Sequence, residues 1–316
     1  MVNIVITTRC NQNCPFCFFQ NKNEKSDISL ENFKKISTWL NENKIKHIGI
    51  LGGEPLLHNK LYDLLEILNK NKIKMNLITN ATVNFEKKII LHPSIETFLI
   101  NASASKDDKN REKLENNINK ICTIDKYKKS KICLGITIYK KDQDIDYIFE
   151  LCKKYSINSI RLDISQPSLK CENLYIKPKD YKKISPLIIK VLSRCKDLNI
   201  KPKLDCGINV SISNILSNRD LEWVKILCKP KFRFCRPIID IFPDLSVIFC
   251  FPLMNFKIDN ILNYNIKEIK NIFLKKIEKY VNYNIDYQGT CIRNLIENKC
   301  KQSLISTDCI MKQNTH

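Results

Sequence analysis

The sequence predicts an α/β protein in which a parallel sheet is covered by helices. Strand-like and helix-like segments alternate from the N-terminus to about residue 198, and such alternation favours parallel strands joined by helices. One helix-like segment carries Leu61, Leu64, Leu65 and Leu68 at helical spacing. These four leucines form a single apolar stripe, which is suited to packing against a sheet.

Six strands and six helices are expected in this part of the chain, in alternating order. The strand candidates are Asn3–Thr7, His47–Leu51, Lys74–Thr79, Glu96–Asn101, Ile132–Tyr139 and Ser159–Ile164. The helix candidates are Leu30–Glu42, Lys60–Asn71, Phe85–Leu91, Asp108–Ile124, Asp144–Tyr155 and Lys179–Asp197.

Three cysteines, Cys10, Cys14 and Cys17, follow the first strand directly, and aromatic residues come after the last of them. Four thiolates hold a complete iron–sulfur cluster, so a group of three leaves one iron open to a ligand. This C-x3-C-x2-C loop resembles the cluster loop of the radical S-adenosylmethionine (SAM) enzymes. A zinc loop, or neighbouring cysteines that are simply buried, are the alternatives.

A second motif, Gly52-Gly53-Glu54-Pro55, follows the second strand in a chain that has only six glycines. Glycine lets a ligand lie directly against the backbone and makes positive φ accessible. In the family resembled, a Gly-Gly-Glu-Pro run meets the amino group of the methionine moiety of SAM. The resemblance therefore implies that Glu54 accepts charge-assisted hydrogen bonds from that ammonium.

The same resemblance implies a partial (β/α)6 barrel, with ligands gathered at the carboxyl ends of its strands. Asn80 follows the third strand in Thr79-Asn80-Ala81, where the family has Thr-Asn-Gly; it would touch the cofactor or cap the next helix. Asn101 and Ser103 stand where the family commonly binds the carboxylate or ribose of SAM. Arg161 would pair with the methionine carboxylate, or with Asp163.

Composition narrows the class of partner. The formal net charge is +20, but the lysines are dispersed along helix-like segments, so we expect no nucleic-acid substrate. Positive potential favours docking of an acidic electron donor such as flavodoxin or ferredoxin. With no apolar run of 18 residues and no signal-peptide pattern, we expect a cytoplasmic protein without a membrane contact.

Fifteen cysteines in the chain fit a cysteine-rich metalloenzyme of a reducing compartment. Five of them lie in helix-like, strand-like or loop segments and are expected to be structural, since free cysteine is a common core residue. These five are Cys122, Cys133, Cys152, Cys171 and Cys195.

After residue 200 the sequence changes character, and we expect two domains: residues 1–200 for the barrel and residues 201–316 for a small cysteine-rich α+β domain. Two β-rich runs joined by Pro243-Asp244-Leu245-Ser246 predict a hairpin, flanked by Cys235 and Cys250. This arrangement resembles the SPASM or twitch extension, which carries auxiliary clusters. The resemblance implies one auxiliary 4Fe–4S cluster on Cys235, Cys250, Cys291 and Cys300, with Cys228 and Cys309 as alternates; a zinc site is the alternative.

The resemblance implies that an electron from the first cluster cleaves SAM into methionine and a 5′-deoxyadenosyl radical, which removes a hydrogen atom from the substrate. Peptide or protein modification by cross-linking, epimerisation or oxidation is the function expected. A small-molecule dehydrogenase, or a non-enzymatic electron-transfer or cluster-assembly protein, are alternatives. Cys206 is a candidate hydrogen donor to a substrate radical, or else a buried residue or an extra ligand.

Overall fold

A computed structural model of the 316-residue chain describes residues 2–17, 19, 26–104, 108–124, 131–168, 171–228, 238–249 and 257–281. Its strands are β1 Val2–Val5, β2 His47–Leu51, β3 Lys74–Thr79, β4 Ile95–Asn101, β5 Ile132–Ile138, β6 Ser159–Ile164, β7 Lys201–Leu204, β8 Ile239–Ile241, β9 Val247–Phe249 and β10 Lys257–Ile258. Its α-helices are α1 Leu30–Glu42, α2 Leu61–Lys70, α3 Lys87–Ile90, α4 Asp108–Ile124, α5 Asp146–Tyr155, α6 Tyr181–Asp197, α7 Cys206–Ile215, α8 Asn218–Cys228 and α9 Ile266–Val281.

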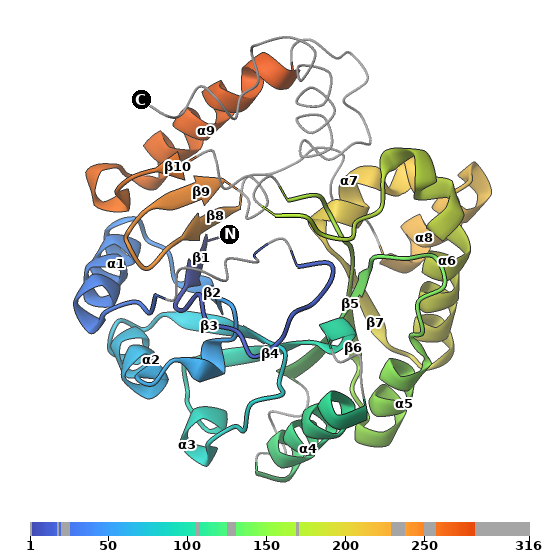
Figure 1. Cartoon of the computed structure of the whole chain (residues 1–316), viewed down its shortest axis with the longest axis horizontal. Coiled ribbons are helices and arrows are strands. Elements are labelled where there is room, and N and C mark those ends of the chain that lie inside the picture. The colour runs from blue at the N-terminus through green and yellow to red at the C-terminus, as the bar shows by residue number, and fades with distance from the viewer. Residues whose placement is uncertain are drawn as a thin grey trace.

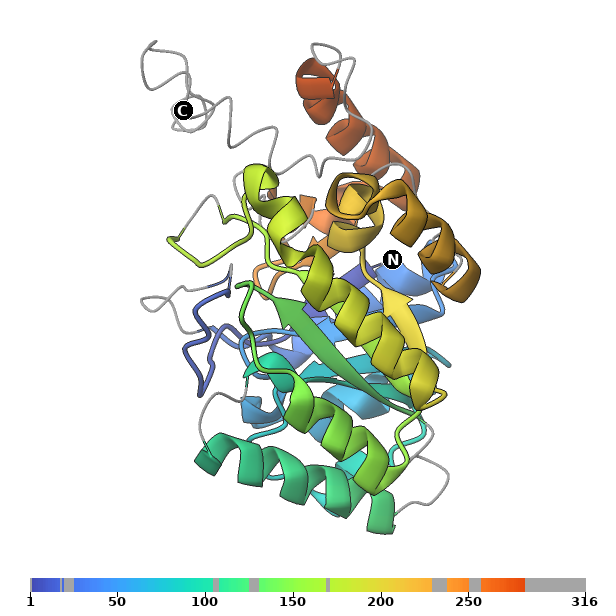
Figure 2. The ribbon, with the colours of Figure 1, turned by 90° about the vertical axis from the view of Figure 1, so that its right-hand side faces the viewer.

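The described strands form one sheet in the order β10-β9-β8-β1-β2-β3-β4-β5-β6-β7. All neighbours from β8 to β7 pair in parallel, and only the β8-β9 and β9-β10 pairs are antiparallel. The sheet curves into a partial barrel with the helices outside it (Figure 1). A view turned by 90° shows helices α4, α5 and α6 layered along the outside of the strands (Figure 2). The predicted α/β partial barrel is therefore confirmed.

Helices cover the sheet because their apolar stripes meet its outer face. Leu61, Leu64, Leu65 and Leu68 of α2 are all buried, as the spacing predicts. The outer-face residues of β3 and β4 join the same hydrophobic core, whereas alternate residues on the inner face are half-buried. Since successive side chains of a strand point to opposite faces, the inside of the barrel is the more accessible side.

The predicted hairpin is confirmed within the described residues, but it is not separate from the barrel. Strands β8 and β9 pair antiparallel, and Phe242 N donates to Ser246 O across the turn at 2.8 Å. Strand β8 also pairs in parallel with β1, where Asn3 lies opposite Asp240. One sheet therefore continues across the expected boundary at residue 200, and the division into 1–200 and 201–316 stays a prediction.

Candidate active site

The cysteine loop lies at the carboxyl end of β1, across the open end of the barrel (Figure 1). Cys10 is exposed, while Cys14 and Cys17 are half-buried. A backbone hydrogen bond from Cys17 N to Cys14 O, 3.1 Å long, tightens the loop into a turn. The three thiols are therefore presented at the edge of the sheet where the other strands also end.

The Gly-Gly-Glu-Pro segment is hydrogen-bonded to the start of this loop. Gly53 N donates to Thr7 O at 2.8 Å, and Glu54 N donates to Arg9 O at 2.7 Å. A Cβ on Gly52 would lie 2.3 Å from Thr7 O, and one on Gly53 would lie 2.2 Å from Arg9 O. From the sequence, these glycines are expected to let a ligand lie against the backbone. In the structure, their lack of a Cβ lets the backbone of the cysteine loop lie there.

Glu54 is fully buried, and its carboxylate accepts three hydrogen bonds from the protein. The donors to its two oxygens are Leu56 N at 3.1 Å, Thr79 Oγ1 at 2.7 Å and Asn80 N at 2.8 Å. Burial raises the pKa of Glu54 to about 7, although these three donors act in the opposite direction. Glu54 thus ties the end of β2 to the end of β3, and its contact with the SAM ammonium stays a prediction.

The turn after β3 holds the cysteine loop from a second side. Asn80 Nδ2 donates to Asn11 Oδ1 at 2.9 Å and lies 4.0 Å from Cys10 Sγ. Asn11 and Gln12 both donate to Thr82 Oγ1, at 2.9 and 3.0 Å. Asn80 therefore lies beside a candidate cluster ligand, and its contact with the cofactor stays a prediction.

Ala81, which stands where the family motif has glycine, adopts a left-handed backbone conformation. Its φ is 53°, in the region that a residue with a Cβ rarely adopts. Hydrogen bonds from Thr82 N and Oγ1 to Asn80 Oδ1, 2.9 and 2.7 Å long, stabilise this turn.

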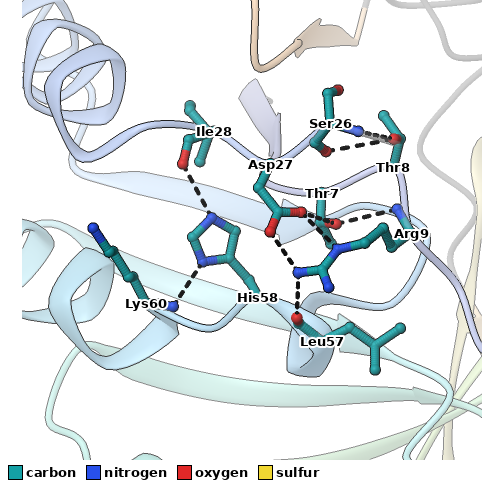
Figure 3. Close-up of polar contacts among 9 residues, drawn as sticks. All are labelled: Thr7, Thr8, Arg9, Ser26, Asp27, Ile28, Leu57, His58 and Lys60. Atoms are coloured by element: carbon teal, nitrogen blue, oxygen red, sulfur yellow. Dashed lines mark hydrogen bonds and ion pairs between the residues drawn. The ribbon is translucent and has the colours of Figure 1, made fainter. Parts of the chain in front are cut away.

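A third anchor joins the start of the loop to the segment that precedes α1 (Figure 3). Arg9 Nε donates to Asp27 Oδ1 at 3.0 Å, and Arg9 Nη2 donates to Asp27 Oδ2. The same Nη2 also donates to the carbonyl oxygen of Leu57, at 2.6 Å. Thr7 Oγ1 adds a hydrogen bond of 2.6 Å to Asp27. Burial raises the pKa of Asp27, but the hydrogen bonds from Arg9 and Thr7 outweigh it and the net pKa is lowered.

Asn101 and Ser103 differ in what they offer a ligand. Asn101 is the last residue of β4, and its Oδ1 is buried without a hydrogen-bond partner among the described residues. Ser103 Oγ accepts from Thr137 N at 2.9 Å and from Gln143 Nε2 at 3.3 Å. Both lone pairs of the serine hydroxyl are thereby used, so Asn101 is the better candidate for an acceptor of a ligand hydrogen bond.

Arg161 lies on the inner face of β6 in the same row as Asn101. The register places Asn101 opposite Gly135 and Gly135 opposite Arg161, so no side chain stands between them. Arg161 forms an ion pair with Asp205, whose side chain is 21% exposed. Asp163 instead accepts from Ile164 N at 2.9 Å.

Cys206 begins α7, directly after Asp205, which occupies the N-cap position. Its backbone lies at the carboxyl edge of β6, because a Cβ on Gly207 would be 2.6 Å from Asp163 Oδ1. The side chain of Cys206 lies outside the part of the chain described, and its function as a hydrogen donor stays a prediction.

The thiols of the cysteine loop suit a cluster whose iron ions provide the positive charge that stabilises thiolates. Burial raises the pKa of Cys10, and it raises the pKa of Cys17 to about 11, so a bound metal would be needed to stabilise the thiolates of these two residues. Cys10 Sγ accepts from Gln12 N and Cys17 Sγ accepts from Phe19 N, both at 3.4 Å. Hydrogen bonds of this kind to sulfur tune iron–sulfur clusters.

No three His, Cys, Asp or Glu side chains converge as ligands of a single metal ion would, within the ranges described. Ligands of one ion must all meet at one point, whereas the thiolates of a cubane bind different irons. The donor set itself, three cysteines with backbone N–H donors to two of their sulfurs, fits a 4Fe–4S cluster.

Of the six candidate ligands of the auxiliary cluster, only Cys228 lies within the described residues. Cys228 is the last residue of α8, is half-buried and packs against the main core. The other candidates, Cys235, Cys250, Cys291, Cys300 and Cys309, lie outside the described residues. The auxiliary cluster and its ligands stay a prediction.

Several residues that hold the site were not identified from the sequence. Arg9, Asn11, Gln12 and Thr82 bind the cysteine loop through contacts that join separate strands, and no local pattern marks them. Cys171, expected to be structural, is half-buried and its Sγ lies 3.7 Å from Cys17 O. The other four cysteines of that group do pack in or against the core.

A comparison with protein families matches the N-terminal part of the chain to one family model. Residues 4–131 match the model of the Radical SAM superfamily. An uncharacterised protein of Methanocaldococcus jannaschii is 28% identical over 218 residues, which are 63% of this chain and 74% of that protein. Residues 4–131 contain the cysteine loop, Gly52–Pro55 and the turn after β3.

Solved structures share the fold over most of the chain. Streptococcus suis SuiB bound to S-adenosylmethionine matches with a TM-score of 0.67 at 15% identity, covering 94% of this chain and 73% of that chain. The protein anSMEcpe, solved with AdoMet and a peptide, matches with a TM-score of 0.60 at 17% identity, covering 88% of this chain and 83% of that chain. At such identities the likeness shows the fold alone.

Residues 4–131 therefore carry a radical SAM domain, and the enzymes of that superfamily use a 4Fe–4S cluster and SAM. No helix in the described ranges is long and apolar enough to cross a membrane.

Proposed function

We propose that this enzyme cleaves SAM reductively and abstracts a hydrogen atom from a peptide or protein, at a side chain or at the backbone. Cross-linking, epimerisation and oxidation are the modifications that this chemistry allows. The observation that carries the proposal is the hydrogen bonding of the three-cysteine loop to Gly53 and Glu54 at the carboxyl edge of the sheet. The cysteine loop and the Gly-Gly-Glu-Pro segment, which are the two motifs of the superfamily, are hydrogen-bonded to each other at that edge.

The residues of this edge have separate tasks. Cys10, Cys14 and Cys17 would hold the cluster and leave one iron for SAM. When bound, the cluster and SAM supply a 5′-deoxyadenosyl radical. Asn101 Oδ1 and Ser165 Oγ are buried and accept or donate no hydrogen bond within the described part of the chain, and buried polar atoms ordinarily have partners. A polar cofactor in the barrel would supply them.

A peptide substrate is supported by the fold and by the inner face of the barrel. The structure of SuiB with its precursor peptide SuiA has a TM-score of 0.62 with this chain, at 15% identity. Asn76, Thr97, Arg161 and Asp163 are half-buried on the inner face. They offer amide, hydroxyl and charged groups, which suit the amides and side chains of a peptide.

An acidic protein such as flavodoxin or ferredoxin is the proposed electron donor. The net charge of +20 would speed the encounter with a negatively charged partner. Because charge steering is screened by salt, the rate of cluster reduction by flavodoxin should fall as ionic strength rises.

Anaerobic reconstitution with iron and sulfide, followed by SAM and a reductant, tests the proposed chemistry. The wild-type chain should form 5′-deoxyadenosine, and a variant with Cys10, Cys14 and Cys17 replaced by alanine should form none. Reductive cleavage by that triple variant would overturn the assignment, and no cleavage by either protein would favour an electron-transfer or assembly protein.

The substrate class can be tested by isotope transfer. Deuterium should move into 5′-deoxyadenosine from a perdeuterated peptide mixture and not from a perdeuterated mixture of small metabolites. The opposite result would identify a small-molecule dehydrogenase.

A further inference from the structure

The segment that follows β6 passes directly over the cysteine loop. Leu174 N donates to Pro15 O at 2.7 Å, and Asn173 Nδ2 donates to Phe16 O at 3.2 Å. The Cys171 thiol makes the third contact, with its Sγ 3.7 Å from Cys17 O. Three consecutive carbonyls of the cysteine loop are therefore bound by one short segment, and a thiol is among the groups that bind them.

Cys171 is held beside the loop by its neighbours rather than by the core. Cys171 N donates to Ser168 Oγ at 3.4 Å, and Ser168 N donates to Asn173 Oδ1 at 3.1 Å. Cys152 and Cys195, by contrast, are buried in the hydrophobic core. A half-buried cysteine that is placed by polar contacts is free of the packing constraints that fix a core cysteine.

Four thiols therefore gather at this edge of the barrel, three from the loop and one from the segment after β6. Thiolate is the ligand that iron–sulfur clusters take most often, and three loop cysteines leave one iron without a protein ligand. A fourth thiol within reach of the loop completes the set that a closed cluster needs.

We propose that Cys171 is a displaceable fourth ligand, whose thiolate binds the open iron when SAM is absent and leaves it when SAM binds. The proposal rests on the three-cysteine cluster proposed above. The exchange is a ligand substitution: the Cys171 sulfur loses its proton to water as the iron–sulfur bond forms. It would regain a proton from water when SAM takes its place at the iron. No electron is transferred in either direction.

The exchange has a consequence for affinity that a purely structural cysteine would not have. SAM binds only the fraction of molecules in which the iron is open, so the measured Kd is the intrinsic Kd divided by that fraction. If Cys171 occupies the iron in nine molecules of ten, its removal should tighten SAM binding about tenfold. Loss of a merely structural contact would loosen the loop and weaken binding instead.

The first test measures the Kd of SAM anaerobically for the reconstituted full chain. Cys171→Ala and Cys171→Ser should bind SAM more tightly than wild type, by about threefold or more. Cys122→Ala removes a half-buried thiol from α4, away from the cysteine loop, and should leave the Kd within about twofold of wild type. An unchanged or higher Kd in both Cys171 variants would overturn the proposal.

The second test follows iron instead of SAM. Mild oxidation without SAM should convert Cys171→Ala to a three-iron cluster, detected by its electron paramagnetic resonance signal, because the open iron is then the one without a thiolate. Wild type and Cys122→Ala should retain four irons at this site, and SAM should protect Cys171→Ala. Equal amounts of the three-iron form in wild type and Cys171→Ala would contradict the proposal.

The two proposals fail in different ways. If the triple alanine variant of Cys10, Cys14 and Cys17 holds as much iron as wild type, the radical SAM cluster itself is misplaced. If that variant loses the cluster while wild type and Cys171→Ala behave alike in both tests, only the assignment of Cys171 is wrong.

Discussion

A Cβ on Gly53 would lie only 2.2 Å from the carbonyl oxygen of Arg9, so the Gly-Gly-Glu-Pro segment and the cysteine loop are fitted backbone to backbone. At that distance the loop must shift to accommodate any side chain. The two motifs of the superfamily therefore depend on each other before any cofactor is considered.

Gly53→Ala should consequently displace the cysteine loop. We expect a loss of iron from the first cluster and a decrease in the free energy of unfolding of about 1–3 kcal/mol, as for other overpacked sites. Gly135→Ala is a matched control, because its Cβ would meet nothing closer than 3.4 Å. Iron analysis and urea denaturation measure the two effects; equal iron in both variants would show that the loop tolerates the displacement.

The Arg9–Asp27 ion pair should stabilise the cysteine loop locally. Asp27→Asn removes the charge that both Arg9 and Thr7 contact, and we expect a loss of about 1 kcal/mol. Glu31→Gln removes the partner of Lys35 in a solvent-exposed pair on α1 and should have no measurable effect. Hydrogen exchange of the amides of residues 7–9 should quicken in Asp27→Asn alone; unchanged exchange there would mean that the pair does not hold the loop.

Glu54 should make stability depend on pH. Its pKa is about 7 in the folded protein and 4.5 ordinarily, so below pH 4.5 the carboxyl is protonated in both states and its contribution to stability is complete. As the pH rises towards 7, the unfolded chain loses this proton first, and on the order of 3 kcal/mol of stability is lost.

Urea denaturation of the metal-free protein between about pH 4 and pH 8 measures this slope. In Glu54→Gln the side chain cannot ionise, so the stability curve should lack this decrease, although the amide also leaves one of the donors to Glu54 unpaired. Parallel curves for wild type and Glu54→Gln would show that Glu54 does not titrate in this range.

The predicted auxiliary cluster should be visible in the iron content. Two cubanes give about eight irons per chain, at four irons each. Alanine at Cys291 and Cys300 together should reduce the count to about four while SAM cleavage persists. A count near four in the unmodified chain would rule out the auxiliary cluster.

The sequence by itself determined the fold class, because both signals it depends on are local. Helical spacing of apolar residues and short apolar runs predicted the bounds of β2, β3, β6, α1 and α4 as the structure has them. The cysteine loop and Gly52–Pro55 were also identified from the sequence, by their resemblance to the motifs of a known family, since each motif lies within a few consecutive residues.

Only the tertiary structure decided which residues hold those motifs in place. Arg9 meets Asp27, Asn80 meets the loop at Asn11, and Cys171 meets Cys17 across 154 positions of the chain. Such contacts depend on how the strands are ordered and how their connections pass over the sheet, and no periodicity in the sequence encodes them. The same holds for the hairpin: its turn was predicted from local residues, but β8 pairs with β1 and extends the sheet there, a contact between residues far apart in the sequence.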